Sequence, residues 1–259
     1  MINFRNSTIT FFTLLLTLNV CALAGLPVHW YEYVGLISVY FGFSVIMAFF
    51  IRSGYHMKAY CNLKTEEKIV SLTFDDGPDK TLTPILLDAL KELDIPATFF
   101  CIGHKIPGNE DLLKRMGSEG HLIGTHSYSH SNWFDFYMPR HLKREILQSL
   151  SAVEEIIGKR PRLFRPPYGV INPSISSALR GMGLHVIGFS NRAWDTSSRN
   201  KETIISRILK NLKPGDIILL HDTVPETIES VKPLFERIKQ AGYRIVSLDK
   251  LLDIPAYEK

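Results

Sequence analysis

The stretch IVSLTFDDGPD, residues 69–79, joins a short apolar run to a pair of acidic side chains and a Gly-Pro turn. The run is rich in β-branched and aromatic residues and has the length of one buried strand. Asp75 and Asp76 follow at its carboxyl end, and Gly77-Pro78 then turns the chain. In sheets of parallel strands, reactive groups gather at the carboxyl ends of the strands. The stretch therefore predicts an α/β fold with polar chemistry at one edge of a parallel sheet.

Strand-like and helix-like patterns alternate over the rest of the chain. Six further strands are predicted at 97–102, 121–125, 163–165, 185–189, 216–221 and 244–247, and six helices at 83–93, 109–118, 141–157, 172–179, 201–212 and 226–240. Two of the helices begin with a capping side chain and a proline, at Thr83-Pro84 and at Asn172-Pro173. About seven strands alternating with helices predict a mostly parallel sheet, whose length allows closure into a barrel.

The composition is that of one catalytic-sized domain with a small additional segment. The chain has 259 residues, of which 45% are hydrophobic and 22% charged, and the net charge of only +4 argues against disorder. Basic and acidic residues are interspersed without a basic tract, so we expect no nucleic-acid partner. The three cysteines, Cys21, Cys61 and Cys101, are too few and too scattered for a disulfide framework or a cysteine zinc site.

Two apolar stretches precede the α/β pattern. Residues 6–28 and 33–50 contain no charged side chain, and both approach or reach the ~20 residues that a helix needs to cross a bilayer. Trp30, Tyr31 and Tyr33 lie between them, where aromatic residues of a membrane interface are expected. The sequence predicts a hairpin of two transmembrane helices, which would make the lipid bilayer a partner.

This prediction divides the chain into three parts: a membrane hairpin at 1–52, a polar linker at 53–67 and a catalytic domain at 68–259. Two alternatives remain for the first part. A cleavable signal peptide could end near Ala22-Leu23-Ala24, and the two stretches could instead be buried core helices.

The flanking charges predict which side of the membrane the domain occupies. Arg5 precedes the first apolar stretch, and Arg52, Lys58 and Lys64 follow the second, whereas the turn between them carries only His29 and Glu32. By the positive-inside rule, both ends of the hairpin are cytoplasmic. We therefore expect a multi-pass protein of a bacterial-type inner membrane with a cytoplasmic domain, and a single crossing would instead place the domain outside.

Titratable side chains follow five of the predicted strands. They are Asp75 and Asp76 after the first, His126 and His130 after the third, Arg165 at the end of the fourth, Asp195 after the fifth and His221 at the end of the sixth. Carboxyl ends of parallel strands meet at one edge. We expect these groups to share one site.

Three of these residues have the pattern of a metal site. The spacing of four between His126 and His130 would place both imidazoles on one face of a helical turn, and Asp76 would add a carboxylate. Two histidines and one carboxylate leave positions open for water and substrate, as in catalytic zinc sites. Zinc fits these ligands, and cobalt, nickel or iron fit them as well.

Four motifs in this order, TFDDGP, HSYSH, RPPYG and LLH, resemble those of the polysaccharide deacetylase (NodB-homology) family, carbohydrate esterase family 4. The resemblance covers about residues 68–252. It implies a distorted (β/α) barrel that uses a divalent metal to remove N- or O-acyl groups, usually acetyl, from amino sugars.

The resemblance also implies roles for single residues. Asp75 matches the catalytic base and His221 the general acid, Arg165 matches the residue that tethers the base, and Asp195 is expected to orient and charge the acid. Asp76, His126 and His130 match the metal ligands. Tyr168 lies where a backbone N–H faces the oxyanion, and Pro167 and Trp194 complete the expected substrate-binding set.

The chain departs from the family at the fourth motif. The family has an aspartate, two or three residues, and then Asp-Trp, whereas this chain continues from Asp195 as Thr196-Ser197-Ser198-Arg199. The second aspartate and the tryptophan wall of the groove are missing, and Trp194 is the candidate replacement. The chemistry is retained, and the substrate is left open.

We therefore expect a membrane-anchored, metal-dependent deacylase that acts on N-acyl, in the first place N-acetyl, groups of an amino-sugar glycan or a lipid-linked sugar. Two alternatives are a deformylase of a polyprenyl-linked sugar and an inactive sugar-binding membrane protein on the same fold. A cytoplasmic domain would need a polyprenyl- or nucleotide-linked amino sugar as its substrate.

Overall fold

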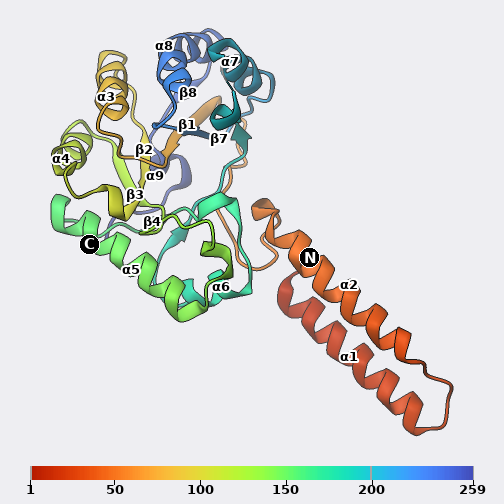
Figure 1. The fold of residues 1–259 in the computed structure, drawn as a ribbon. Coiled ribbons are helices and arrows are strands. Elements are labelled where there is room, and N and C mark those ends of the chain that lie inside the picture. The colour runs from red at the N-terminus through yellow and green to blue at the C-terminus, as the bar shows by residue number, and fades with distance from the viewer. Residues whose placement is uncertain (1, 199, 259) are drawn as a thin grey trace.

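The computed structural model describes residues 2–198 and 200–258, which form an α/β domain and an N-terminal pair of helices that projects from it (Figure 1). At the centre of the domain lies β1 (Ile69–Asp75), in which every residue after the first is buried. β1 pairs in parallel with β2 (Thr98–Cys101) on one side and with β7 (Ile217–His221) on the other. A central parallel strand is covered on both faces, which explains its nearly continuous apolar run.

The sheet continues outward from β1 in both directions. Its order is β5-β4-β3-β2-β1-β7-β6, every pairing is parallel, and β8 also pairs with the first residues of β1. The outer strands are β3 (Leu122–Thr125), β4 (Leu163–Phe164), β5 (His185–Val186), β6 (Asn191–Arg192) and β8 (Arg244–Ile245). Within the described ranges no strand pairing joins β5 to β6, so the sheet is a curled half-barrel. The predicted parallel sheet is confirmed in this open form.

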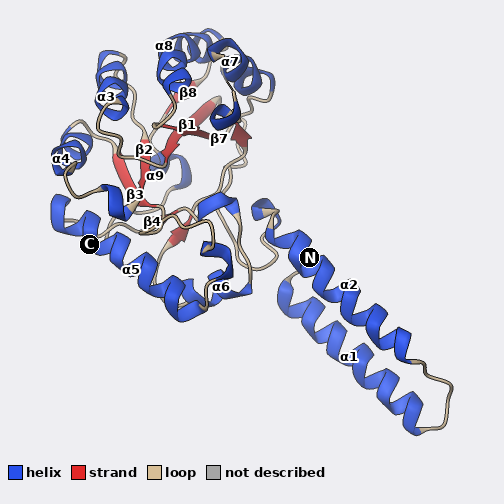
Figure 2. Cartoon of the chain, viewed as in Figure 1, coloured by secondary structure: helices blue, strands red, loops and turns tan. Residues whose placement is uncertain are grey.

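The helices of the domain lie on the outside of the sheet (Figure 2), except the short α9 (Leu248–Leu252), whose Leu248 and Leu251 share a buried cluster with Phe100 and Ile217 on the opposite face. They are α3 (Leu82–Glu92), α4 (Glu110–Ser118), α5 (Pro139–Ile157), α6 (Pro173–Leu179), α7 (Lys201–Lys210), α8 (Pro225–Gln240) and α9 (Leu248–Leu252). All six predicted helices are present, with ends within two residues of the prediction. The short elements β6 and α9 were not predicted, because two and five residues carry no readable periodicity.

The predicted cap of α3 is wrong. The helix begins at Leu82, and Asp79 Oδ1 accepts hydrogen bonds from the N–H groups of Thr81 and Leu82, at 2.8 and 2.7 Å. Thr83 lies inside the first turn, where its hydroxyl donates to Asp222 Oδ2 at 2.6 Å. Asp79, four residues earlier, therefore takes the capping role expected of Thr83.

Side chains of β1 alternate between two environments. Val70, Leu72 and Phe74 belong to the large buried cluster that the helices α3, α7 and α8 complete. The alternate residues Thr73 and Asp75 point to the opposite face, because successive side chains of a strand face opposite ways. This alternation places the polar residues of β1 inside the curled sheet.

The N-terminal hairpin consists of α1 (Phe4–Leu23) and α2 (Trp30–Ala48), of 20 and 19 residues. Only 6% and 11% of their most apolar windows are buried, so they are not core helices of the domain, and that alternative is wrong. Their length and composition are those of a membrane anchor or of a signal sequence.

The segment after the hairpin is partly built into the domain. Tyr60 pairs beside β5: its N–H donates to Val186 O, and its carbonyl accepts from Gly188 N, both at 2.8 Å. Leu63 N donates to Gly215 O at 2.9 Å, just before β7. Residues 60–63 therefore bridge the open side of the half-barrel between β5 and the start of β7.

Candidate active site

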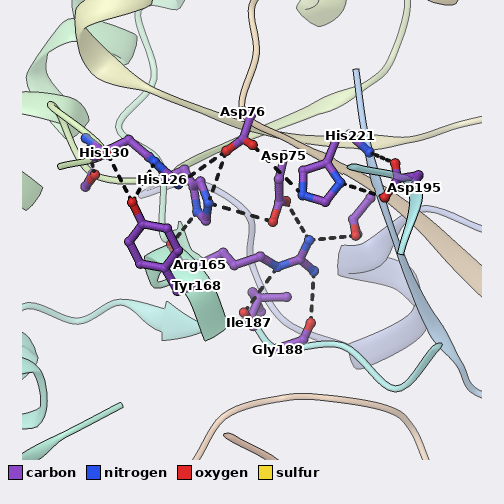
Figure 3. A network of polar contacts seen from close by, with 12 residues as sticks. Asp75, Asp76, His126, His130, Arg165, Tyr168, Ile187, Gly188, Asp195 and His221 are labelled. Carbon is purple, nitrogen blue, oxygen red and sulfur yellow. Dashed lines mark hydrogen bonds and ion pairs between the residues drawn. The ribbon is translucent and has the colours of Figure 1, made fainter. Parts of the chain in front are cut away.

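The two aspartates after β1 reach one pocket because the chain turns between them. Asp75 is the last residue of β1 and is buried. Asp76 has a φ of 74°, in the left-handed region, which swings its carboxylate back beside that of Asp75 (Figure 3). The turn continues through Gly77, where a Cβ atom would collide with the buried Asp222 carboxylate. The expectation that Gly77-Pro78 turns both aspartates toward one site is confirmed.

His126 and His130 follow β3 on a loop and not on a helical turn as the spacing suggested. Ser127 and His130 both have positive φ, 64° and 48°, and the Ser127 hydroxyl accepts a hydrogen bond from His130 N at 3.0 Å. Glu145 on α5 fixes the middle of the loop by accepting from the N–H and the hydroxyl of Ser129, both at 2.8 Å. This folded loop still brings the two imidazoles together, with ring centroids 5.0 Å apart.

Asp76, His126 and His130 form a three-sided donor set. Asp76 Oδ1 lies 3.6 Å from His126 Nε2 and 3.3 Å from His130 Nε2, and one donor atom from each residue lies within 4.8 Å of the others. His126 Nδ1 donates to Arg165 O at 2.8 Å, which leaves Nε2 with its lone pair directed at the cluster.

The lowered pKa of His130 and the burial of Asp76 Oδ1 also suit the binding of a cation. Burial and the neighbouring His126 lower the pKa of His130 to about 4, against the opposing charge of Asp76, so its imidazole is neutral at physiological pH. Asp76 Oδ1 is buried without a hydrogen-bond donor. A buried carboxylate oxygen facing two imidazoles fits a divalent metal, and the oxygen and nitrogen donors match zinc, cobalt and nickel.

Arg165 holds Asp75 in place from inside the sheet. Its Nη1 donates to Asp75 Oδ1 and to Thr73 Oγ1, both at 2.7 Å, and its Nη2 donates to Gly188 O at 2.9 Å (Figure 3). The guanidinium also lies over the Phe100 ring, 4.2 Å from its centroid. Arg165 is only 1% exposed, so it is not a surface ion pair but a buried charge with a full set of partners.

His221 ends β7 beside Asp195, from the connection after β6. Asp195 Oδ1 accepts from His221 Nδ1 at 2.9 Å, and its Oδ2 accepts from His221 N at 2.8 Å and from the Thr227 hydroxyl at 2.7 Å. Burial lowers the pKa of His221, but the hydrogen bond and charge of Asp195, together with Asp75 and Asp76, raise it by more. His221 Nε2 faces the pocket 3.9 Å from Asp76 Oδ2.

All of these groups except Asp195, which lies behind His221, line a cavity of about 200 Å³. Of the expected substrate-binding residues, Tyr168 lies at its rim with a φ of 58°, and its hydroxyl donates to Asn132 Oδ1 at 3.0 Å. Pro167 is buried and Trp194 lies outside the lining, with its ring 4.1 Å from the Arg192 guanidinium.

Sequence reasoning missed several residues of the lining. Phe189, Arg192, Thr196 and Leu219 all border the cavity. Arg192 belongs to the two-residue strand β6 and brings a positive charge to the pocket, and Thr196 belongs to the segment that departs from the family motif. The available signal was closeness in sequence to predicted site residues: Phe189, Arg192 and Thr196 lie within six residues of Asp195, and Leu219 lies two residues before His221.

Comparisons with known proteins find relatives over most of the α/β domain. A family model described as polysaccharide deacetylase matches residues 62–187. A peptidoglycan-N-acetylglucosamine deacetylase of Bacillus cereus is 37% identical over 197 residues, which cover 72% of this chain and 89% of the relative.

Solved structures are similar over about three quarters of the chain. The crystal structure of the Bc1960 peptidoglycan N-acetylglucosamine deacetylase superposes with a TM-score of 0.73 at 29% identity, covering 76% of this chain and 94% of that one. A family 4 acetyl xylan esterase from Clostridium thermocellum, in complex with a cobalt ion, gives a TM-score of 0.67 at 31% identity, covering 73% and 94%.

Proposed function

Because the chain belongs to the polysaccharide deacetylase family, carbohydrate esterase family 4, we propose that it removes the N-acetyl group from N-acetylglucosamine units of a peptidoglycan-type glycan. It is a hydrolase of carbon–nitrogen bonds other than peptide bonds. The observation that carries the proposal is that Asp75 and His221 lie beside the Asp76, His126 and His130 donor set within one small pocket. The names of the relatives support the glycan as substrate.

The proposed centre is a divalent metal held by Asp76, His126 and His130. When bound there, the ion polarises the acyl carbonyl and makes water more acidic. The remaining requirements of amide hydrolysis are a base, a site for the oxyanion and an acid for the leaving nitrogen.

This chain has a residue for each requirement. Asp75, which Arg165 holds in place, accepts the proton of the attacking water as the carbon–oxygen bond forms. The backbone N–H of Tyr168 is assigned to the oxyanion. His221, kept cationic by Asp195, then donates its proton to the sugar nitrogen as the carbon–nitrogen bond breaks, because an unprotonated amine is a poor leaving group.

Release of acetate tests the proposal. The full chain, loaded with zinc in lipid nanodiscs, should release acetate from N-acetyl chito-oligosaccharides and from purified peptidoglycan. Asp75→Asn should abolish the release, whereas Asp111→Asn, a change at an exposed aspartate of α4, should leave it unchanged. Full release by the Asp75→Asn protein would refute the assignment of the base, and no release by the unchanged chain from either substrate would refute the proposed substrate.

The same reaction on a polyprenyl-linked amino sugar is the second candidate, with acetyl or formyl as the leaving acyl group. The flanking residues Arg52, Lys58 and Lys64 favour it, because a cytoplasmic domain would meet lipid-linked precursors before export. Mass spectrometry of the products distinguishes loss of acetyl from loss of formyl.

Membrane anchoring by α1 and α2 is part of the proposal, and its sidedness has a direct test. Alkaline phosphatase fused after Lys64 is active only outside the cytoplasm. The charge distribution predicts low phosphatase activity in whole cells. High activity would refute the cytoplasmic orientation and would favour the glycan over the lipid-linked precursor.

A further inference from the structure

Three large apolar side chains lie exposed on the segment that follows the His126–His130 loop. Trp133, Phe136 and Met138 are 67%, 78% and 74% exposed, and the rings of the first two lie 5.9 Å apart by their centroids. A soluble surface rarely gathers such side chains without a partner. We propose that these three residues, here called the apolar rim, insert into the interface of the bilayer that anchors the hairpin. The inference rests on the proposed anchoring by α1 and α2.

Hydrogen bonds place the apolar rim beside the base of the hairpin. Ile171 N donates to the carbonyl of Ala48, the last residue of α2, at 3.0 Å. The next residue, Asn172, donates from its side-chain amide to Asp135 O at 2.5 Å. Asp135 immediately precedes Phe136. Hydrogen bonds through two consecutive residues, Ile171 and Asn172, therefore connect the end of α2 to the backbone next to Phe136.

Apolar packing also joins the segment of the apolar rim to the base of the hairpin. Phe134 begins the 3-10 turn (Phe134–Phe136) that contains Phe136, and it is fully buried. It belongs to one apolar cluster with Ile51 from just after α2, with Ile171 from just before α6 and with Ile175 in α6. One side of the turn is thus fixed to the hairpin base while Phe136 points outward. Figure 1 shows α6 on the side of the domain from which the hairpin projects.

The depth of this region matches a bilayer surface. The 19 residues of α2 extend over about 28 Å at 1.5 Å per residue, close to the ~30 Å of a hydrocarbon core. If α2 spans that core, then Ala48 lies at the interface and the apolar rim lies at the same level. Tryptophan and phenylalanine are the side chains that favour this depth.

Positive charges surround the same region. Arg5 and Arg180 line a hollow between the start of α1 and α6, and the exposed Arg140 follows Met138 by two residues. Basic side chains next to an apolar insertion are the pattern that binds anionic lipid headgroups. The charge pattern therefore favours a bilayer over an uncharged sugar chain as the occupant.

The contact would fix the pocket close to the membrane. His130, a member of the proposed metal site, lies three residues before Trp133. Asn132, between them, accepts a hydrogen bond from the hydroxyl of Tyr168, which lines the pocket. The pocket would then open beside the bilayer surface, where it would meet glycan units still attached to lipid or newly released from it.

Depth-dependent quenching of tryptophan fluorescence tests the contact without relying on catalysis. The full chain is reconstituted in nanodiscs that contain phosphatidylglycerol, with or without bromine on the acyl chains. One variant retains Trp133 alone through Trp30→Phe and Trp194→Phe, and a second retains Trp30 alone as a measure of hairpin insertion. A matched control carries Ile85→Trp in a background without the native tryptophans, because Ile85 is 51% exposed on α3, on the far side of the domain from the hairpin (Figure 1).

We expect bromine to quench Trp30 and Trp133 but not the tryptophan at position 85. Phe136→Ser with Met138→Ser should reduce the quenching of Trp133 by at least half. Quenching of Trp30 without quenching of Trp133 would overturn the inference while leaving the anchoring intact. Absence of quenching at Trp30 would overturn both. Quenching of Trp133 by soluble chito-oligosaccharide, with no response to brominated lipid, would identify a sugar-stacking surface and would also overturn the inference.

Discussion

Replacement of Asp195 by asparagine tests how the proposed general acid is kept protonated. Asp195 is 0% exposed and accepts three hydrogen bonds, two from His221 and one from Thr227. In Asp195→Asn the amide oxygen can still accept at the Oδ2 position. The amide NH₂ then faces His221 Nδ1, which must act as an acceptor. An imidazole that accepts at Nδ1 cannot be the imidazolium without losing that hydrogen bond.

The size of the effect follows from the bond that is lost. A hydrogen bond involving a charged group contributes about 1.5–3 kcal/mol, and 1.4 kcal/mol corresponds to about a tenfold change. At alkaline pH, the fraction of His221 in the imidazolium form should therefore fall about ten- to a hundredfold. Because only this form can act as the acid, kcat/KM should fall there by a similar factor. The pKa of His221 is raised in the folded protein, so activity is lost as pH rises through that raised value. Without the carboxylate, activity should be lost at a lower pH.

The assay is the pH profile of kcat/KM for acetate release, with zinc content measured for each protein. Asp195→Asn should move the alkaline limb to lower pH and leave bound zinc unchanged. Thr227→Val removes the hydroxyl that orients Asp195 but retains the carboxylate, so it should move the alkaline limb by less than Asp195→Asn does. An unmoved alkaline limb in active, zinc-loaded Asp195→Asn would refute the role of Asp195.

Three further changes test other parts of the site and fold. His126→Ala should remove most bound metal and activity, and stoichiometric metal in the purified variant would contradict the ligand assignment. Arg165→Met should lower the free energy of unfolding by about 3–5 kcal/mol, because it leaves the buried Asp75 carboxylate without its charged partner; a melting temperature unchanged in calorimetry would show that the pair is not needed. Gly188→Ala should loosen the segment after the hairpin, because the added Cβ collides with Cys61 Sγ, and unchanged protection of Cys61 from thiol reagents would contradict this.

The regular part of the fold was predictable because its signals are local. β1, β7 and the long helices carry apolar periodicities that depend only on neighbouring residues. The polar residues at the strand ends came together as expected, because parallel strands bring their carboxyl ends to one edge. His221 and Asp195, far apart in sequence, are in direct contact for this reason.

The remainder depends on contacts that the sequence pattern does not encode. The His126–His130 loop was expected as a helical turn, but positive φ at Ser127 and His130 folds it differently, and no glycine marks those positions. The direction of Trp194 is set by its own positive φ of 55°, which places its ring over Arg192 and outside the lining of the pocket. Such backbone choices are imposed by tertiary packing, which local patterns do not report.

The bridge that residues 60–63 form across the open sheet bears on how a soluble form of the enzyme should be prepared. A chain shortened to begin at Lys68 would retain every motif residue, yet it would expose the main-chain groups of Val186 and Gly188 that Tyr60 now satisfies. An uncovered sheet edge recruits strands from other molecules. Aggregation of such a truncated protein would therefore reflect a missing edge and not an intrinsic instability of the catalytic half, and a start a few residues before Tyr60 should keep the truncated enzyme monomeric.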